Sequence, residues 1–456
     1  MEEVKNYFKH HRSSHLNQLK EFLSIPSISA DPEHKPDMET AASWVEESMQ
    51  SAGLENTAVM ETGGHPVVYG DWMHAPGKPT VLFYGHYDVQ PADPVELWET
   101  PPFQPDIRDE KIYARGATDD KGQVFMHLKT IEAFMQTKQE LPVNVKFCIE
   151  GEEEIGSPNL DEFVEKHRDL LQGDVLLVSD TPMLEKGRPT VCYGLRGLAG
   201  IQIDVNGAKG DLHSGLYGGG VANPLHALAD ILASMHDDSG RITVDGFYDR
   251  VVSLTGQERQ AYAELSYDEE NTRKELNVPE LFGEEGFSFL ERTWARPTLE
   301  INGMHGGFQG EGIKTVLPSA ASAKITCRLV PDQDPDEIVE KLTAHVQHKT
   351  PKGVEVDVIP FDKGRPFVTP FDHPAIQAAG RALETAYGTT AAYTRMGGSV
   401  PVIETFSEIL NVPVALMGFG LPTENFHAPN EHFHLENYDK GLEALAEYLI
   451  EISENL

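Results

Sequence analysis

Hydrophobic positions in the first part of the chain follow two periods that alternate along the sequence. Short apolar runs bounded by turn residues are typical of buried strands, and segments whose apolar residues recur every three or four positions are typical of helices. The predicted strands are residues 66–69, 80–84, 143–149 and 174–178, and the predicted helices are 1–25, 38–52, 122–136 and 159–171. This alternation predicts a mostly parallel sheet with helices on both faces.

The pattern changes near residue 196. Strands with one exposed face are predicted at 199–205, 297–301, 321–330 and 354–359, with helices at 224–235 and 336–348. The α/β pattern of the first part then resumes, with a helix predicted at 375–387, a strand at 412–417 and a helix at 437–450. We therefore expect an α/β domain of residues 1–196 and 366–456, interrupted by an inserted α+β domain of residues 197–365. Residues 240–295 are charged and irregular, and their pattern assigns no elements.

Composition narrows the functional class. A chain of 456 residues is too long for one ordinary core, and its formal net charge of −36 disfavours binding to nucleic acid or anionic membrane. Neither a membrane-spanning apolar run nor the apolar core of a secretory signal is found. Cys148, Cys192 and Cys327 are widely spaced, which indicates buried residues in a reducing compartment. We expect a cytoplasmic protein.

Several predicted strands are followed directly by histidine or carboxylate residues. These residues are His86 and Asp88 after the strand at 80–84, Glu152, Glu153 and Glu154 after 143–149, Asp180 after 174–178, and His427 after 412–417. Asp119 lies just before the helix at 122–136. Because ligands of parallel sheets bind beyond the carboxyl ends of the strands, these side chains are expected at one edge of one sheet.

Carboxylates gathered at one edge would repel one another unless cations neutralise them. Mixed imidazole and carboxylate ligands suit Zn2+, with Mn2+ or Co2+ as alternatives. Two ions about 3.5–4 Å apart need a carboxylate that bridges them. Asp119, which stands between the two histidine-containing groups in chain order and lies at a glycine-flanked turn, is the candidate bridge.

A series of short sequence blocks occurs in the order found in one known family. The blocks are GHYDVQP (85–91), RGATDDKG (115–122), EGEEEIGS (150–157), SD (179–180), DLHSG (211–215), RLVP (328–331), RMGGSVPV (395–402) and FHAPNE (426–431). On these blocks the sequence resembles the M20 family of dinuclear zinc peptidases, most closely its carnosinase-like metallodipeptidase branch. The resemblance extends over almost the whole chain.

The resemblance implies a set of metal ligands. His86 and Asp180 would hold one zinc ion, Glu154 and His427 the other, and Asp119 would bridge them. Asp88 would accept a hydrogen bond from the far nitrogen of His86 and fix its orientation. Asp119 and Asp120 would be joined by a cis peptide bond, as in relatives.

The resemblance also implies which glutamate does the chemistry. Alignment on Gly156 and Ser157 makes Glu153 the general base and Glu154 the ligand, and leaves Glu152 without a role. A register shifted by one residue would exchange these roles. The FHAPNE block selects His427 as the ligand over His432 and His434.

Further residues are implied in substrate binding. His213 would stabilise the oxyanion in the active site of a neighbouring subunit, which predicts a homodimer with the inserted domain as lid. Arg328, Thr315 and Ser399 would hold the substrate carboxylate. Met396 stands where many relatives carry an acid, so the preference at the amine end stays open.

The expected activity is cleavage of the amide bond of dipeptides or short peptides. An N-acyl amino acid deacylase or desuccinylase of the same family is an alternative with identical chemistry. A metal-binding module without activity is a remote alternative, because such a module would not need Glu153 beside its ligands.

Overall fold

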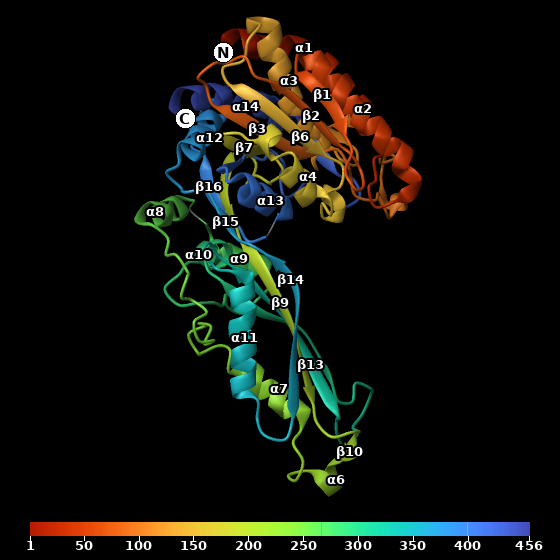
Figure 1. Cartoon of the computed structure of the whole chain (residues 1–456), viewed down its shortest axis with the longest axis vertical. Coiled ribbons are helices and arrows are strands. Elements are labelled where there is room, and N and C mark those ends of the chain that lie inside the picture. The colour runs from red at the N-terminus through yellow and green to blue at the C-terminus, as the bar shows by residue number, and fades with distance from the viewer. Residues whose placement is uncertain (266, 399) are drawn as a thin grey trace. The chain divides into compact units, whose positions relative to one another are not determined.

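The computed structural model describes residues 1–265, 267–398 and 400–456. The chain forms two compact units (Figure 1). The first unit contains Met1–Tyr193, Thr369–Thr394 and Pro401–Leu456, and the second contains Gly194–Val368 and Arg395–Val400. The domain bounds expected from the sequence, 1–196 with 366–456 and 197–365, stay a prediction, and each unit is described by itself.

A mixed sheet forms the centre of the first unit. Its order is β1 (Glu55–Met60), β2 (Val67–Trp72), β6 (Asn144–Glu150), β3 (Thr80–His86), β7 (Val175–Val178), β17 (Val414–Leu416) and β8 (Thr190–Leu195). The strands β6, β3, β7 and β17 are parallel, whereas β1, β2 and β8 pair antiparallel at the two sides. β16 (Ala392–Met396) and β15 (Phe367–Val368) both pair with β8, where the chain passes between the units. The predicted strands at 80–84, 143–149, 174–178 and 412–417 thus form the parallel middle of the sheet, whereas the predicted strand at 66–69 is β2 and pairs antiparallel.

Helices cover both faces of this sheet (Figure 1). Two adjacent residues of β3 show this arrangement: the Phe83 ring lies 5.0 Å from that of His127 in the helix Lys121–Lys138, and the Tyr84 ring lies 5.3 Å from that of Phe406 in the helix Pro401–Leu410. One layer consists of α1 (Glu2–Leu23), α2 (Lys35–Ala52), α3 (Lys121–Lys138), α12 (Pro374–Tyr387) and α14 (Leu435–Asn455). The other consists of α4 (Leu160–Lys166), α5 (Arg168–Leu171) and α13 (Pro401–Leu410).

Short elements lie between the longer helices and strands of this unit. Three 3-10 helices lie at η1 (Pro32–His34), η2 (Val95–Leu97) and η3 (Glu153–Ile155). A small antiparallel sheet pairs β18 (His432–His434) with β5 (Lys111–Tyr113), and β5 with β4 (Asp106–Arg108). The small sheet brings the segment before α3 next to the segment before α14.

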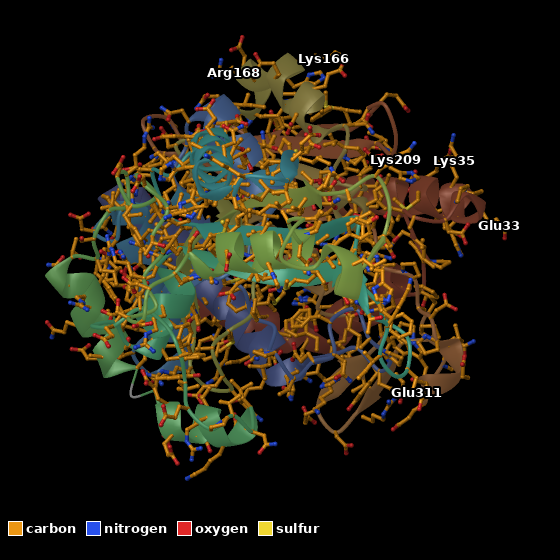
Figure 2. All side chains as sticks on the ribbon, turned by 90° about the horizontal axis from the view of Figure 1, so that it is seen from below. Glu33, Lys35, Lys166, Arg168, Lys209 and Glu311 are labelled. Carbon is orange, nitrogen blue, oxygen red and sulfur yellow. The ribbon has the colours of Figure 1, made fainter. Side chains whose placement is uncertain are left out.

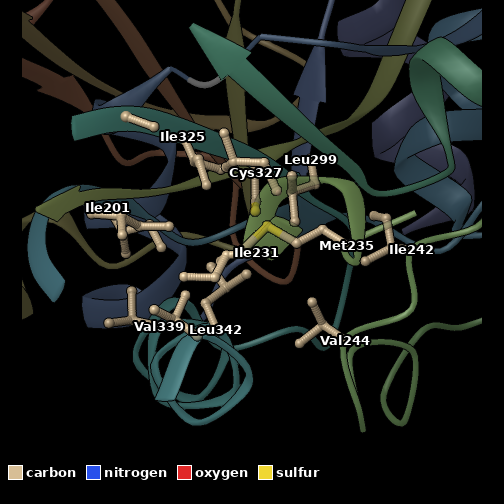
Figure 3. Close-up of a cluster of buried hydrophobic side chains, with 14 of the residues drawn as sticks. Ile201, Ile231, Met235, Ile242, Val244, Leu299, Ile325, Cys327, Val339 and Leu342 are labelled. Atoms are coloured by element: carbon tan, nitrogen blue, oxygen red, sulfur yellow. The ribbon is translucent and has the colours of Figure 1, made fainter. Parts of the chain in front are cut away.

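The second unit is built on an antiparallel sheet in the order β11 (Thr298–Gly306), β13 (Ala320–Leu329), β9 (Gly197–Asn206) and β14 (Glu355–Gly364). Alternate residues of β9 and β13 pack against α7 (Pro224–Ala233) and α11 (Pro335–Lys349) in one apolar cluster, part of which is drawn in Figure 3. Ile201, Ile325 and Leu342 are fully buried there. Nearby, β10 (Leu212–His213) pairs with β12 (Val316–Leu317), and α6 (Ser214–Tyr217) follows β10.

The segment 240–295, which the sequence pattern left without elements, contains α8 (Gly256–Glu264), α9 (Glu269–Glu275) and α10 (Phe289–Trp294). The sequence feature that marks two of these helices is the pair of capping residues at their N-termini. Thr255 with Glu258 and Ser288 with Glu291 form reciprocal capping boxes, in which each side chain bonds to the other residue's backbone N–H. Short charged helices of this kind carry little apolar periodicity, which explains why the periodicity did not reveal them.

Charged side chains project from the surface, and Figure 2 labels six of them, Glu33, Lys35, Lys166, Arg168, Lys209 and Glu311. Cys148, Cys192 and Cys327 are buried in β6, β8 and β13. Within the part of the chain that the structure describes, no helix is both long enough and apolar enough to span a membrane.

Candidate active site

The candidate site lies at the carboxyl ends of the parallel strands. His86 is the last residue of β3, Asp180 comes two residues after β7, and Glu154 lies in η3 just after β6. His427 lies in the loop between β17 and β18, and Asp119 stands two residues before α3. This is the sheet edge at which open α/β sheets bind their ligands.

One group of possible metal ligands contains His86, Asp119 and Asp180. Each offers a ligand atom, and these atoms all lie within 4.8 Å of one another. The Nε2 atom of His86 lies 3.2 Å from Oδ1 of Asp119 and 3.9 Å from Oδ2 of Asp180. His86 is fully buried, so its ring is held in place on all sides.

A second group contains Asp119, Glu154 and His427. The Nε2 atom of His427 lies 2.8 Å from Oδ2 of Asp119 and 3.3 Å from Oε2 of Glu154. Asp119 belongs to both groups and faces one histidine with each oxygen: Oδ1 faces His86 and Oδ2 faces His427. A carboxylate that bridges two cations needs this disposition. The structure thus brings together all five residues expected as ligands.

The carboxylates in this site strongly affect one another. Burial and the charge of Asp119 raise the pKa of Asp180 to about 7. Burial, together with the charges of Asp180 and Glu154, raises the pKa of Glu153 to about 8, although the nearby His86 opposes the shift. Hydrogen bonds to Asp119 and Glu154 raise the pKa of His427 to about 10. A bound cation would favour ionised carboxylates and neutral histidines, and therefore relieve this repulsion.

The residues present fit a divalent metal ion. Among the described residues, the buried atoms Nε2 of His86 and Oδ1 of Asp120 have no hydrogen-bond partner, although such atoms are normally paired. Metal coordination would satisfy the histidine nitrogen. The donors are imidazole nitrogens and carboxylate oxygens, the ligands that suit zinc and, as alternatives, manganese or cobalt.

Asp88 lies against the far nitrogen of His86, as expected. The Nδ1 atom of His86 bonds to the backbone carbonyl of Asp88 at 3.1 Å, while the Asp88 carboxylate lies 3.3 Å away. Since a carbonyl can only accept, Nδ1 carries the proton and Nε2 stays available to a metal. The Asp88 carboxylate instead accepts hydrogen bonds from the Ser29 hydroxyl at 2.6 Å and the Glu154 backbone N–H at 3.1 Å. Asp88 therefore links the loop after β3 to the loop after β6.

The peptide bond between Asp119 and Asp120 is cis, as the resemblance implied. The Asp120 carboxylate accepts a hydrogen bond from the backbone N–H of His86 at 3.2 Å. The loop before α3 is thereby attached to the end of β3.

The three consecutive glutamates have different surroundings. Glu154 belongs to a ligand group, and Glu153, half-buried beside it, belongs to neither. Glu152 is buried and accepts a hydrogen bond from the Asn159 side chain at 2.8 Å, so it is turned toward its own loop. These surroundings agree with Glu153 as a base beside the ligands, and its role stays a prediction.

Glu150, Glu424 and Glu431 are buried carboxylates near the site for which the sequence predicted no role. Glu150 accepts hydrogen bonds from Tyr84 at 2.5 Å and Ser157 at 2.9 Å. Glu424 accepts from His434, and Glu431 from the loop that carries Asp119. Glu150 and Glu431 stand inside the sequence blocks that carry the resemblance, which is the signal that could have singled them out.

The expected substrate-binding residues belong to the second unit. His213 ends β10, and its Nδ1 accepts a hydrogen bond from the Gly215 N–H at 3.0 Å, which leaves the proton on Nε2. Thr315 lies beside it, because its carbonyl accepts from the Ser214 N–H at 3.1 Å. Arg328 lies on β13 opposite Thr298 of β11. Ser399, the remaining expected residue, lies outside the described residues.

Comparisons with known proteins agree with this site. Residues 82–451 match the model of "Peptidase family M20/M25/M40". The chain is 33% identical to the Cys-Gly metallodipeptidase DUG1 of Candida albicans over 95% of its length and 93% of that protein. It is also 33% identical to the Beta-Ala-His dipeptidase of Homo sapiens, over 100% of this chain and 93% of the relative.

A solved structure shows the same fold. The M20 family metallo-carboxypeptidase Sso-CP2 from Sulfolobus solfataricus aligns with a TM-score of 0.79 and 34% identity, covering 96% of this chain and 99% of the other. The family match and the relatives extend over both units and include every candidate ligand. This chain therefore belongs to the peptidase family M20/M25/M40.

Proposed function

We propose that this protein hydrolyses the amide bond of dipeptides or short peptides and uses two divalent metal ions, of which zinc suits the ligands best. The observation that carries the proposal is Asp119, whose two oxygens face His86 and His427 separately. Two relatives at 33% identity, a metallodipeptidase and a dipeptidase, support the substrate class.

Two divalent ions at this site would supply Lewis acidity toward the scissile carbonyl and lower the pKa of a water molecule. Glu153 would accept a proton from the attacking water and deliver it to the leaving amine nitrogen. Its raised pKa, about 8 without cations, shows that burial and the neighbouring carboxylates favour a proton on this residue. Asp88 contributes by fixing the tautomer of His86 through its backbone carbonyl.

We assign the second unit to substrate binding and dimerisation. His213 carries its ring proton on Nε2 and would donate it to the oxyanion in a partner subunit's site. Arg328, Thr315 and Ser399 would hold the substrate carboxylate. The side chains of Leu216, Tyr217 and Ile313 are 76%, 46% and 94% exposed, and large apolar residues at a surface favour an interface with a second copy.

The proposed compartment is the cytoplasm. Support comes from Cys148, Cys192 and Cys327, which are buried in three separate strands, as cysteines in a reducing environment commonly are.

Removal and replacement of the metal test the proposed function. The purified protein is treated with a chelator, divided, and restored with zinc, manganese or cobalt, and each sample is assayed on dipeptides and N-acyl amino acids. We expect the chelated protein to be inactive and the restored protein to cleave dipeptides with the higher kcat/KM. Faster cleavage of N-acyl amino acids would indicate the deacylase alternative. A protein that holds no metal and gains no activity with any of these ions would contradict the proposal.

A further inference from the structure

One buried carboxylate organises the loop that carries Asp119. Glu431 is fully buried and accepts four hydrogen bonds. Its Oε2 accepts from the Arg115 guanidinium at 2.8 Å and from the Gly116 N–H at 2.9 Å. Its Oε1 accepts from the N–H groups of Thr118 at 3.0 Å and Asp119 at 3.2 Å. The backbone of residues 116–119 is therefore wrapped around one side chain.

The same side chain is tied to the second histidine loop. Glu431 stands four residues after His427, and its carbonyl accepts a hydrogen bond from the Ala114 N–H at 3.2 Å. The residues that follow Glu431 form β18, which pairs antiparallel with β5, and His432 lies opposite Tyr113. The Thr118 hydroxyl adds a hydrogen bond to the His432 carbonyl at 2.7 Å. The loops of Asp119 and His427 are thus held together by contacts that involve neither metal-ligand side chain.

We propose that Glu431 is a positioning residue that fixes Asp119 relative to His427 and thereby sets the affinity of the metal site. The proposal rests on the proposed function, because it assumes that these two residues are ligands. In the part of the chain that the structure describes, the Glu431 side chain bonds to Arg115 and to backbone N–H groups rather than to a ligand side chain. It acts through the backbone of Asp119 and through its own short connection to His427.

Only a carboxylate of this length satisfies the arrangement. All four partners are donors, so both oxygens must accept, and the buried Arg115 needs an opposite charge. A glutamine would turn an NH2 group toward two of the donors. An aspartate keeps the charge but reaches one methylene less far, so it should leave part of the loop unsupported.

The first experiment measures zinc affinity by competition with a chelating dye in folded Glu431→Gln protein. We expect the affinity to fall by about 10–100-fold, the usual effect of removing a group that orients metal ligands. The matched control is Glu132→Gln. Glu132 is another mostly buried carboxylate with several partners, Tyr7, His15 and Lys129, but it belongs to α3 and bonds across to α1. The control should lose stability in urea yet bind zinc like the wild type.

A second measurement uses the unmodified protein and does not depend on a variant that folds. Hydrogen exchange of the chelated wild-type chain should show slow exchange at the amides of Gly116, Thr118 and Asp119, because Glu431 holds them without a metal. In Glu431→Asp these amides should exchange faster, while the Val124 amide, which bonds to the Asp120 carbonyl at 2.9 Å, should keep its rate.

Three outcomes would overturn the inference: fast exchange of these amides in the chelated wild type, unchanged exchange in Glu431→Asp, or zinc affinity of Glu431→Gln within threefold of the wild type. Zinc binding by the wild-type protein distinguishes these results from a failure of the proposed function. If the proposed function is wrong, the wild-type protein itself binds no zinc.

Discussion

At the scale of single residues, three consecutive glutamates have three different environments. Glu152 bonds to Asn159, Glu154 faces His427, and Glu153 lies between them with its pKa raised by burial and by its acidic neighbours. Chemically identical side chains therefore have different hydrogen-bond partners and different pKa shifts because of their position alone. A carboxylate that is costly to ionise is suited to accept a proton during a reaction.

Glutamine substitution of each glutamate in turn tests this assignment. Glu153→Gln should lower kcat by about 10²–10⁴-fold or more, because the isosteric amide cannot accept a proton, and should keep the metal content of the wild type. Glu154→Gln should lose metal, and Glu152→Gln should keep most activity because its amide oxygen can still accept from Asn159. Kinetics with elemental analysis provide the readout. An active Glu153→Gln enzyme would shift the assignment of base and ligand by one residue.

At the scale of elements, the site depends on two strands whose ends run side by side. β7 and β17 are parallel and paired from Leu176 with Val414 to Val178 with Leu416. The two loops that follow remain together, since the Met183 N–H donates to the Gly420 carbonyl at 2.8 Å. Between them, a Cβ atom on Gly418 would lie 1.4 Å from the Thr181 carbonyl oxygen. A glycine is required there so that the loop carrying Asp180 can approach.

Gly418→Ala should therefore displace the Asp180 loop. Because 1.4 Å is far below any tolerated contact, the backbone must move, and a misplacement of about 1 Å in an active site can lower kcat/KM by about 10²-fold. The control is Gly210→Ala, since a Cβ atom at Gly210 would meet nothing within 4 Å. Measurements are kcat/KM and metal content of both variants. Equal kcat/KM for Gly418→Ala and wild type would show that this approach is not needed.

At the scale of the whole molecule, the chemistry and the expected substrate contacts belong to different units. The candidate ligands lie in the first unit, whereas His213, Thr315 and Arg328 lie in the second. The second unit has its own apolar core, formed by β9, β13, α7 and α11, so it is a separately packed body. A residue on such a body can serve the active site of a second copy of the chain.

Mixed dimers test whether His213 acts across subunits. Glu153→Gln and His213→Ala chains with different tags are expressed together, and the mixed dimer is purified. If His213 serves the partner, one of the two sites combines an intact Glu153 with an intact His213, so the mixed dimer should regain activity that both parent dimers lack. Analytical ultracentrifugation checks the dimer itself. A mixed dimer as inactive as its parents would restrict His213 to its own subunit.

The sequence by itself determined the class of fold and the identity of the candidate ligands. Buried parallel strands read as continuous apolar runs, so β3, β6 and β7 were recognisable, and the acids and histidines after them followed from chain order. The blocks that resemble the family then separated Glu153 from Glu154 and His427 from His432. These are local signals, carried by residues close together in the chain.

Only the tertiary structure decided what depends on distant partners. The antiparallel edges of the sheet, the hydrogen bond of His86 to the Asp88 carbonyl and the four donors around Glu431 are not encoded in any short segment. Periodicity reports which side of an element is buried, but not which strand lies beside it or which group accepts a proton. In the sequence, Glu431 is therefore only the last residue of the block FHAPNE. Folding brings Arg115, which lies 316 residues earlier in the chain, into contact with it.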